Sequence, residues 1–204
     1  MPRNAGRAKE QRMNQNLLII GAGIYGLVAK EIAESMGCFL QIDFVDDGAK
    51  KTPDGTPVVG TTHDLVELSQ GYANVVVAIG NPEARQKLIC LIEEETLLRL
   101  VPLISPRAYV SPSAQIGKGC IVEPMAVVHT GCVLGKGCLI CAGAVVNHGA
   151  MCGDCVQVDC NAVVPGNTVV QSGVKVNAGT VYEKKIPHCP VSVDGSEFRV
   201  EDDK

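Results

Sequence analysis

One short stretch of the sequence, GAVVNHGAMCGDC from Gly143 to Cys155, contains a side chain suited to acid–base chemistry. His148 lies there between Asn147 and a glycine. An imidazole has an unperturbed pKa of about 6.5, so an exposed one can take up a proton near neutral pH. His148 is therefore a candidate general base, with Asn147 as a candidate partner that orients its ring.

The same stretch also contains half of a cysteine pattern. Two C-x2-C pairs follow each other in the chain, formed by Cys138, Cys141, Cys152 and Cys155. Paired cysteines at this spacing are typical of zinc sites, in which four sulfurs converge on one tetrahedral ion. The local fold determines whether these cysteines bind a metal ion or pack in the core.

A six-residue repeat from Ala108 to Gly179 provides that fold. Twelve hexads follow one another without insertion, and the third position is Val, Ile or Leu in eleven of the twelve, Cys152 being the exception. The first position is always small or β-branched, and the sixth is most often Gly, which tolerates the positive φ of a tight corner. The pattern predicts a triangular prism of parallel strands with about four coils, in which third positions point inward.

This frame argues against zinc. Cys152 points into the core, whereas Cys138 occupies a first position in a hexad two steps earlier, on another face. The four sulfurs cannot converge without breaking the repeat, so we expect packing and no metal. His148 occupies a fifth position, at an exposed corner, with Thr130 and Gly166 as its neighbours one coil away.

The segment before the repeat has a different pattern. A buried strand, a Gly-rich turn (Gly21, Gly23 and Gly26) and an amphipathic helix are followed by a second strand that ends in Asp46 and Asp47. A further strand, a Gly80-Asn81 turn and a helix come next. Alternating strands and helices predict a small Rossmann-like α/β domain, and its length favours a mononucleotide or a nucleotide sugar over NAD.

The predicted organisation has four parts: an N-terminal extension (1–15), a Rossmann-like nucleotide-sugar-binding domain (16–103), a β-helix (104–183) and a C-terminal tail (184–204). The net charge of −4 argues against a nucleic-acid-binding protein, which needs a basic face. No apolar run is long enough for a membrane span, and the first residues lack the apolar core of a signal peptide. We therefore expect a cytoplasmic protein whose ten cysteines are reduced.

Several motifs together suggest a family. The Gly-rich turn, the Asp-Asp pair, AIGNPEAR, ISPRAYVSPSAQIG and VVNHGAMCGD resemble the nucleotide-sugar acetyltransferases of the bacillosamine-pathway type, which belong with the sialic-acid O-acetyltransferases. The resemblance implies a left-handed β-helix, a homotrimer with active sites between subunits, acetyl-CoA as co-substrate and a UDP-linked amino sugar as acceptor.

The resemblance also assigns roles to positions. His148 falls on the family's catalytic histidine. The candidates for orienting it are Asn147 and a carboxylate or carbonyl from the neighbouring chain. The implied substrate contacts are Gly23, Ile24, Tyr25, Asp46, Asp47, Gly80 and Asn81. The implied acetyl-CoA contacts are Gln157 and Ala178, to which we add Gly166 as the donor of an N–H to the thioester oxygen.

This chain departs from the family pattern at three of its positions. Gly149 stands where close relatives often have an acidic residue, Gln157 stands where a histidine is often seen, and Tyr25 replaces a common histidine. The resemblance implies N-acetylation of a sugar amine with direct transfer to the acceptor. O-acetylation of a sugar such as sialic acid, and a non-catalytic scaffold that binds a nucleotide sugar, remain open as alternatives.

Overall fold

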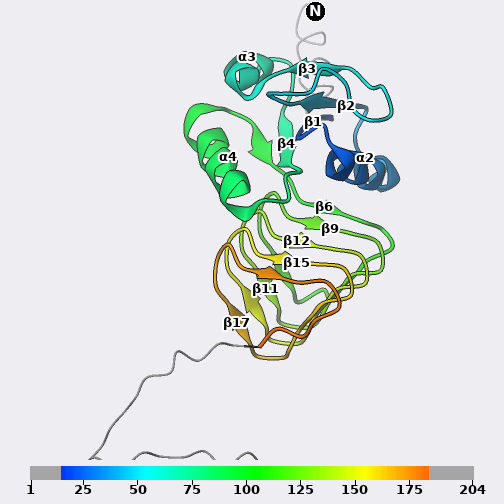
Figure 1. Cartoon of the computed structure of the whole chain (residues 1–204), viewed down its shortest axis with the longest axis vertical. Coiled ribbons are helices and arrows are strands. Elements are labelled where there is room, and N and C mark those ends of the chain that lie inside the picture. The colour runs from blue at the N-terminus through cyan, green and yellow to red at the C-terminus, as the bar shows by residue number, and fades with distance from the viewer. Residues whose placement is uncertain (1–14, 184–204) are drawn as a thin grey trace, which may run out of the picture.

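The computed structural model describes residues 15–183 of the 204-residue chain. The predicted C-terminal tail and all but the last residue of the predicted N-terminal extension lie outside the described residues. Within them the chain forms an α/β unit that stands on one end of a long prism of short strands (Figure 1).

The α/β unit is a five-stranded parallel sheet with helices on its faces, in the order β3-β2-β1-β4-β5. Its elements are β1 (Asn16–Ile20), α2 (Ile24–Met36), β2 (Gln41–Val45), β3 (Val58–Gly60), a 3-10 turn (Thr62–Asp64), α3 (Leu65–Leu68), β4 (Asn74–Val77), α4 (Pro82–Glu95) and β5 (Arg99–Leu100). The predicted Rossmann-like fold is confirmed, and β3, α3 and β5 add elements that the sequence pattern did not predict.

Local sequence explains where the two long helices begin and end. Helix α4 starts where Asn81 accepts a hydrogen bond from the N–H of Ala84 at 2.9 Å, with Pro82 in the first helical position. Helix α2 ends at Gly37, which adopts φ +66°, a left-handed conformation that glycine enters without steric cost.

The prism contains thirteen two-residue strands in three parallel sheets. One sheet holds β7 (Tyr109–Val110), β10 (Val127–Val128), β13 (Val145–Val146) and β16 (Val163–Val164). A second holds β8 (Gln115–Ile116), β11 (Val133–Leu134), β14 (Met151–Cys152) and β17 (Val169–Val170). The third holds β6 (Leu103–Ile104), β9 (Ile121–Val122), β12 (Leu139–Ile140), β15 (Gln157–Val158) and β18 (Lys175–Val176).

The strands follow the hexad frame closely. Every predicted hexad supplies one strand at its second and third positions, and strands one coil apart pair in register, for example Val127 with Val145. The predicted left-handed β-helix is confirmed. It begins one hexad before Ala108, because Ile104 fills the inward third position of the hexad that starts at Pro102.

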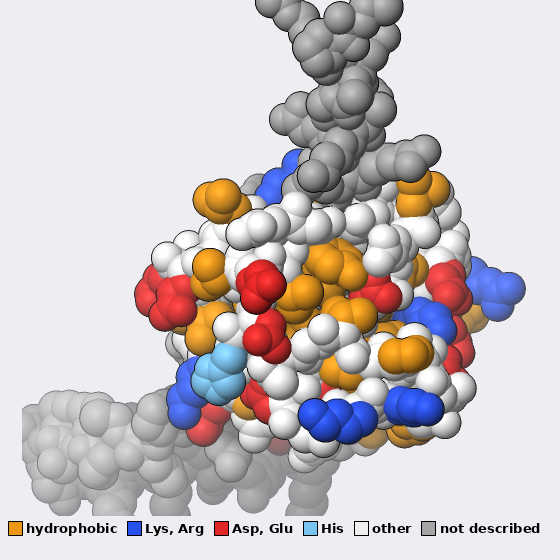
Figure 2. Space-filling model, turned by 90° about the horizontal axis from the view of Figure 1, so that it is seen from above, with side chains coloured by type: hydrophobic (Ala, Val, Ile, Leu, Met, Phe, Trp, Pro, Cys, Tyr) orange, Lys and Arg blue, Asp and Glu red, His pale blue; other side chains and the backbone are white. Residues whose placement is uncertain are grey.

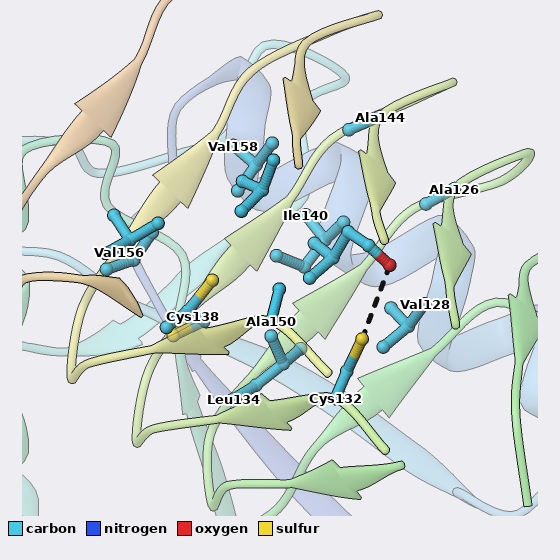
Figure 3. Packing of buried hydrophobic residues seen from close by; sticks show 14 of the residues in the cluster. Ala126, Val128, Cys132, Leu134, Cys138, Ile140, Ala144, Ala150, Val156 and Val158 are labelled. Carbon is cyan, nitrogen blue, oxygen red and sulfur yellow. Dashed lines mark hydrogen bonds between the residues drawn. The ribbon is translucent and has the colours of Figure 1, made fainter. Parts of the chain in front are cut away.

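The third positions fill the prism from top to bottom, and small residues at first positions fit beside them (Figure 3). Cys132 and Cys138 are fully buried in this core, and their thiols donate to main-chain oxygens of the next coil, Asn147 at 3.0 Å and Gly153 at 3.1 Å. The cysteines are thus small apolar side chains with weak donors. No group of three or more metal-ligating side chains occurs within residues 15–183.

Helix α2 fixes the α/β unit to the third sheet of the prism. The outward-facing side chains of Leu103, Ile121 and Leu139 are fully buried and join the apolar cluster of α2 and β1. Burying a side chain of this size contributes about 1.5–3 kcal/mol. The junction between the two units is therefore a packed core.

The end of the molecule away from the prism has a mixed surface (Figure 2). Acidic and basic side chains are interspersed there around a central group of hydrophobic ones, and neither charge covers that face continuously. Among the described helices, each is too short or too polar to cross a membrane.

Candidate functional site

His148 lies on the corner of the prism between β13 and β14. The α/β unit covers the third sheet through α2, and α4 reaches the edge between the second and third sheets, where Gly137 and Cys155 lie one coil apart. The His148 corner is thus the one that faces away from the α/β unit of its own chain. The imidazole is exposed, as the hexad frame predicts.

Asn147 fixes the tautomer of the imidazole. Its Oδ1 accepts the backbone N–H of His148 at 2.8 Å, so the atom at this position must be the amide oxygen and not the nitrogen. The same Oδ1 lies 2.9 Å from Nδ1 of the ring, which must then carry the proton. Nε2 is left with its lone pair free, as a general base requires.

Gly166 makes room for the ring one coil further on. A Cβ at this position would lie 2.8 Å from both Cε1 and Nε2 of His148, closer than side-chain contacts allow. The imidazole therefore lies against a glycine backbone. The Gly166 N–H has no acceptor among the described residues, which leaves it available to a ligand beside Nε2.

The structure explains why Gly149 follows His148. Gly149 has φ +66°, and a Cβ there would lie 2.3 Å from Oδ1 of Asn167 on the next coil. An acidic residue at this position would meet both a strained backbone and the Asn167 amide. In this chain Asn147 makes the contact to Nδ1.

A second candidate site lies at the carboxyl edge of the α/β sheet. From β1 the chain crosses to β2 on one side and, later, to β4 on the other, so the order β3-β2-β1-β4-β5 has a switch point between β1 and β4. Ligands of open α/β sheets bind in the crevice at such a point. The predicted substrate residues Gly23 and Ile24, at the start of α2, and Gly80, on the loop after β4, border this point.

This crevice has the features of an anion site. Gly23 is the N-cap of α2 and offers no side-chain cap, and the first turn contains no acidic residue. The amides of that turn are therefore free donors at the positive end of the helix dipole. Positions Gly23 and Gly80 both face open space, since a Cβ at either would meet nothing within 4 Å, and Ile24 is 68 % exposed.

Asp46 organises the loops of the crevice. Its carboxylate accepts the backbone N–H groups of Ala22 at 2.8 Å, Gly48 at 2.9 Å and Ala49 at 2.8 Å. Burial acts to raise the pKa of Asp46, but these three hydrogen bonds outweigh it and hold the pKa below its usual value. Both oxygens are thus already engaged, and direct contact between Asp46 and a ligand stays a prediction.

Asp47 and Asn81 are also partly engaged. Asp47 accepts the backbone N–H of Thr62 at 2.7 Å and its hydroxyl at 2.9 Å, which ties the end of β2 to the 3-10 turn. Asn81 uses Oδ1 to cap α4, which leaves its Nδ2 as the donor that a ligand could meet. Both side chains are exposed at the sheet edge where the sequence placed them.

The side chain of Tyr25 points away from the crevice, into the junction between the α/β unit and the prism. Its hydroxyl is buried and has no hydrogen-bond partner among the described residues. Burial, together with the nearby Cys141 and Glu123 of the prism, raises the pKa of Tyr25 well above its usual value. Tyr25 is therefore a neutral side chain at the contact between the two units.

The predicted acetyl-CoA contacts do not gather around His148 of the same chain. Gly166 does, but Gln157 lies on the third sheet and Ala178 follows β18 at the corner after it. Gln157 is only 8 % exposed, and its Oε1 has no partner among the described residues. His148 and Gln157 therefore lie on different faces of the prism within one chain.

Arg85 is the residue that sequence reasoning missed. It is fully buried on α4 and contacts both the loop after β4 and the prism. The one signal for it is helical spacing, because Arg85, Ile89 and Ile92 form the buried stripe of α4. A charged residue in an otherwise apolar stripe indicates a specific partner.

Comparison with protein families gives two matches. The PglD N-terminal domain family matches residues 16–92, and the bacterial transferase hexapeptide family (six repeats) matches residues 113–148. Comparison with curated protein sequences gives no match.

Solved structures similar to this chain match it over most of its length. The acetyltransferase domain of PglB from Neisseria gonorrhoeae is 33 % identical with a TM-score of 0.75, and the match covers 86 % of this chain and 94 % of that one. The same domain in complex with acetyl coenzyme A is 34 % identical over 83 % and 91 % of the two chains, again with a TM-score of 0.75. A His-to-Asn mutant of perosamine N-acetyltransferase from Caulobacter crescentus, in complex with CoA and GDP-perosamine, is 28 % identical over 81 % and 90 %, with a TM-score of 0.56.

Proposed function

This chain belongs to the acetyl-CoA-dependent sugar N-acetyltransferases that join a PglD N-terminal domain to a hexapeptide-repeat β-helix, and we propose that it acetylates the amino group of a UDP-linked amino sugar with His148 as general base. The observation that carries the proposal is the pairing of His148 Nδ1 with Asn147 Oδ1 at 2.9 Å, which leaves an exposed Nε2 as proton acceptor.

The reaction needs one proton transfer and no covalent enzyme intermediate. The sugar amine attacks the thioester carbonyl, and Nε2 of His148 takes the proton that the nitrogen loses as the C–N bond forms. The tetrahedral intermediate carries a negative oxygen, to which the N–H of Gly166, without an acceptor among the described residues, would donate. Collapse breaks the C–S bond and releases coenzyme A, which receives a proton in turn.

Asn147 acts here as a positioning residue. A protonated Nδ1 held by Oδ1 keeps the lone pair on Nε2, and the same hydrogen bond stabilises the imidazolium that forms during transfer. A neutral amide gives less of this stabilisation than the carboxylate that relatives often have at the next position. We therefore expect a working base with a modest orienting group.

We assign the nucleotide to the crevice between β1 and β4. The uncapped first turn of α2 would receive a phosphate, and the open positions Gly23 and Gly80 allow close approach to the backbone. The exposed side chains of Ile24, Asp47 and Asn81 border the same space.

The acetyl-CoA site requires a second copy of the chain. His148 faces away from its own crevice, and the outward rows that flank its corner are apolar, with Tyr109, Met151 and Val169 each about half exposed. Apolar rows of this kind are typical of protein interfaces. A homotrimer would cover them and place a neighbouring prism, with its Gln157 and Ala178, beside His148. Because Oε1 of Gln157 is buried in its own chain, this side chain would have to turn outward to contact acetyl-CoA.

The test measures release of coenzyme A thiol with UDP-linked amino sugars, GDP-linked amino sugars and free sialic acid as acceptors. We expect turnover with a UDP-linked amino sugar and a loss of about 10²–10⁴-fold in His148→Ala, the usual contribution of general acid–base catalysis. His129→Ala is the matched control, because His129 lies one coil away on the same corner and its ring makes an edge contact with Tyr109 but no hydrogen bond or ion pair within residues 15–183.

Other outcomes distinguish the alternatives. Acetylation of sialic acid in place of the nucleotide sugars would establish the O-acetyltransferase, and a preference for GDP-linked acceptors would overturn the UDP assignment. Equal, slow thiol release by the wild type and His148→Ala with every acceptor would indicate a non-catalytic scaffold. A monomeric mass in solution would refute the trimer and with it the shared acetyl-CoA site.

A further inference from the structure

Arg85 is a fully buried cation at the junction of the two units. Its hydrogen bonds all go to main-chain carbonyl oxygens, and none of the ion pairs among the described residues includes it. Burial lowers the pKa of Arg85, but guanidinium groups remain charged in proteins because their ordinary pKa exceeds 12. A charge held in this way is costly unless its donors are well satisfied.

The geometry of these bonds joins three segments. Nη1 donates to the carbonyls of Ile79 at 2.6 Å and Gly80 at 3.2 Å, which form the loop after β4. Nε donates to Gly137 at 2.7 Å and Nη2 to Cys155 at 2.7 Å, which lie one coil apart on the prism corner. The planar fork of one side chain therefore holds the crevice loop against two coils of the β-helix.

We infer that Arg85 is a positioning residue for nucleotide binding: by holding the carbonyls of Ile79 and Gly80 against the prism corner, it fixes the Gly80-Asn81 loop in the conformation that receives the ligand. The inference rests on the proposed function, because it takes the crevice between β1 and β4 as the nucleotide site.

Two features of the Gly80-Asn81 loop indicate that it needs the hydrogen bonds from Arg85. Gly80 has no Cβ and meets nothing within 4 Å on its side-chain face, so no packing from that side restrains it. Asn81 is exposed and must present its amide while capping α4. A loop that is open on the ligand side needs contacts from the opposite side, and Arg85 provides them there together with the packing of Ile79 against the core.

The chain offers a matched control. Lys136 also joins the prism to α4, through a salt bridge of 2.7 Å from its Nζ to Oε2 of Glu93. This pair is partly exposed, so it contributes little to stability, and it does not touch the crevice loop. Lys136→Gln removes a contact between the same two units without affecting the loop.

The experiment compares Arg85→Lys and Lys136→Gln in the full-length protein with two readouts. Lysine keeps the charge but, as a point donor, cannot reach all four carbonyls. We expect Arg85→Lys to weaken UDP binding about tenfold or more by calorimetry, as for loss of one charged hydrogen bond, and to speed amide hydrogen exchange across residues 78–84. Acetyl-CoA affinity, measured separately, should stay at the wild-type value, and Lys136→Gln should match the wild type in every readout.

Hydrogen exchange and UDP binding together distinguish a failure of the positioning role from a failure of the nucleotide assignment. Unchanged exchange across residues 78–84 in Arg85→Lys would overturn the positioning role whether or not UDP binds. Failure of the wild type to bind UDP while exchange does increase in Arg85→Lys would instead refute the nucleotide assignment. If Arg85→Lys does not fold, Arg85→Ala with added guanidinium ion serves as the second variant: slower exchange in this segment on addition supports the role, and no response to the ion contradicts it.

Discussion

Gly166→Ala isolates the geometry of the proposed base without removing any functional group. The new methyl carbon would lie 2.8 Å from Cε1 and from Nε2 of His148, whereas ordinary contacts begin at 3.4 Å. The ring must therefore move by about 0.6 Å or more, and it can do so, because the imidazole is exposed on its other side. Movement lengthens the 2.9 Å hydrogen bond to Asn147 and shifts Nε2 from the line of proton transfer.

The expected cost follows from the displacement. A misplacement of about 1 Å in a reacting group costs about 100-fold in rate, equivalent to about 2.7 kcal/mol of activation free energy. We expect kcat/KM for the acceptor in Gly166→Ala to fall by this order, with little change in the unfolding temperature, since the surface ring can give way. Coenzyme A release under single-turnover conditions measures the transfer step itself.

Gly71→Ala is the control for this variant. A Cβ at Gly71 would meet nothing closer than the carbonyl oxygen of Leu68 at 3.8 Å, so the variant adds the same methyl group without a collision and away from His148. It should retain the wild-type rate. A Gly166→Ala enzyme with unchanged kcat/KM would refute the placement of the ring against Gly166 during catalysis.

Two further predictions concern stability. Asp46 has a lowered pKa in the folded protein, so its contribution to stability is present above the unfolded pKa of about 3.9 and is lost as the pH falls through the folded pKa. Urea unfolding should therefore show that Asp46→Asn is less stable than the wild type at pH 7, with a difference that shrinks toward about pH 2. A difference in stability that stays constant with pH would contradict this role of Asp46. Gly149→Ala should lower the free energy of unfolding by about 1–2 kcal/mol because of the φ of +66°, and by a further amount because the new Cβ collides with Asn167. Adding Asn167→Gly to this variant should recover only the loss caused by the collision. If the effects of the two substitutions on the free energy of unfolding simply add, the two side chains do not meet.

The hexad frame predicted the prism and the surroundings of His148 because its geometry is set by local spacing. A fifth position must lie at a corner, and the residue eighteen positions later must lie beside it on the next coil, so Gly166 beside His148 follows from counting. The same counting places Gln157 on another face of the prism.

Contacts between the two units were not predictable in this way. The sequence shows Arg85 only as a charged residue on the buried stripe of a helix, and nothing in the repeat indicates that α4 meets Gly137 and Cys155. Asp46 is similar: an acidic pair after β2 suggested a ligand, whereas its carboxylate holds three backbone amides. In both cases the partner is main chain, which carries no sequence signal.

The placement of His148 explains why a single chain would not suffice for the proposed reaction. The α/β unit is fixed to the third sheet by a packed core and to the next corner by Arg85, so it cannot swing to the corner between β13 and β14 without exposing Leu103, Ile121 and Leu139. Leaving those three side chains in water would cost several kcal/mol, since each contributes about 1.5–3 kcal/mol when buried. In the proposed trimer, a neighbouring prism would reach the same arrangement by association alone, and it would cover apolar rows that are otherwise half exposed. Because the junction within the chain is rigid, the proposed reaction would need a site shared between chains.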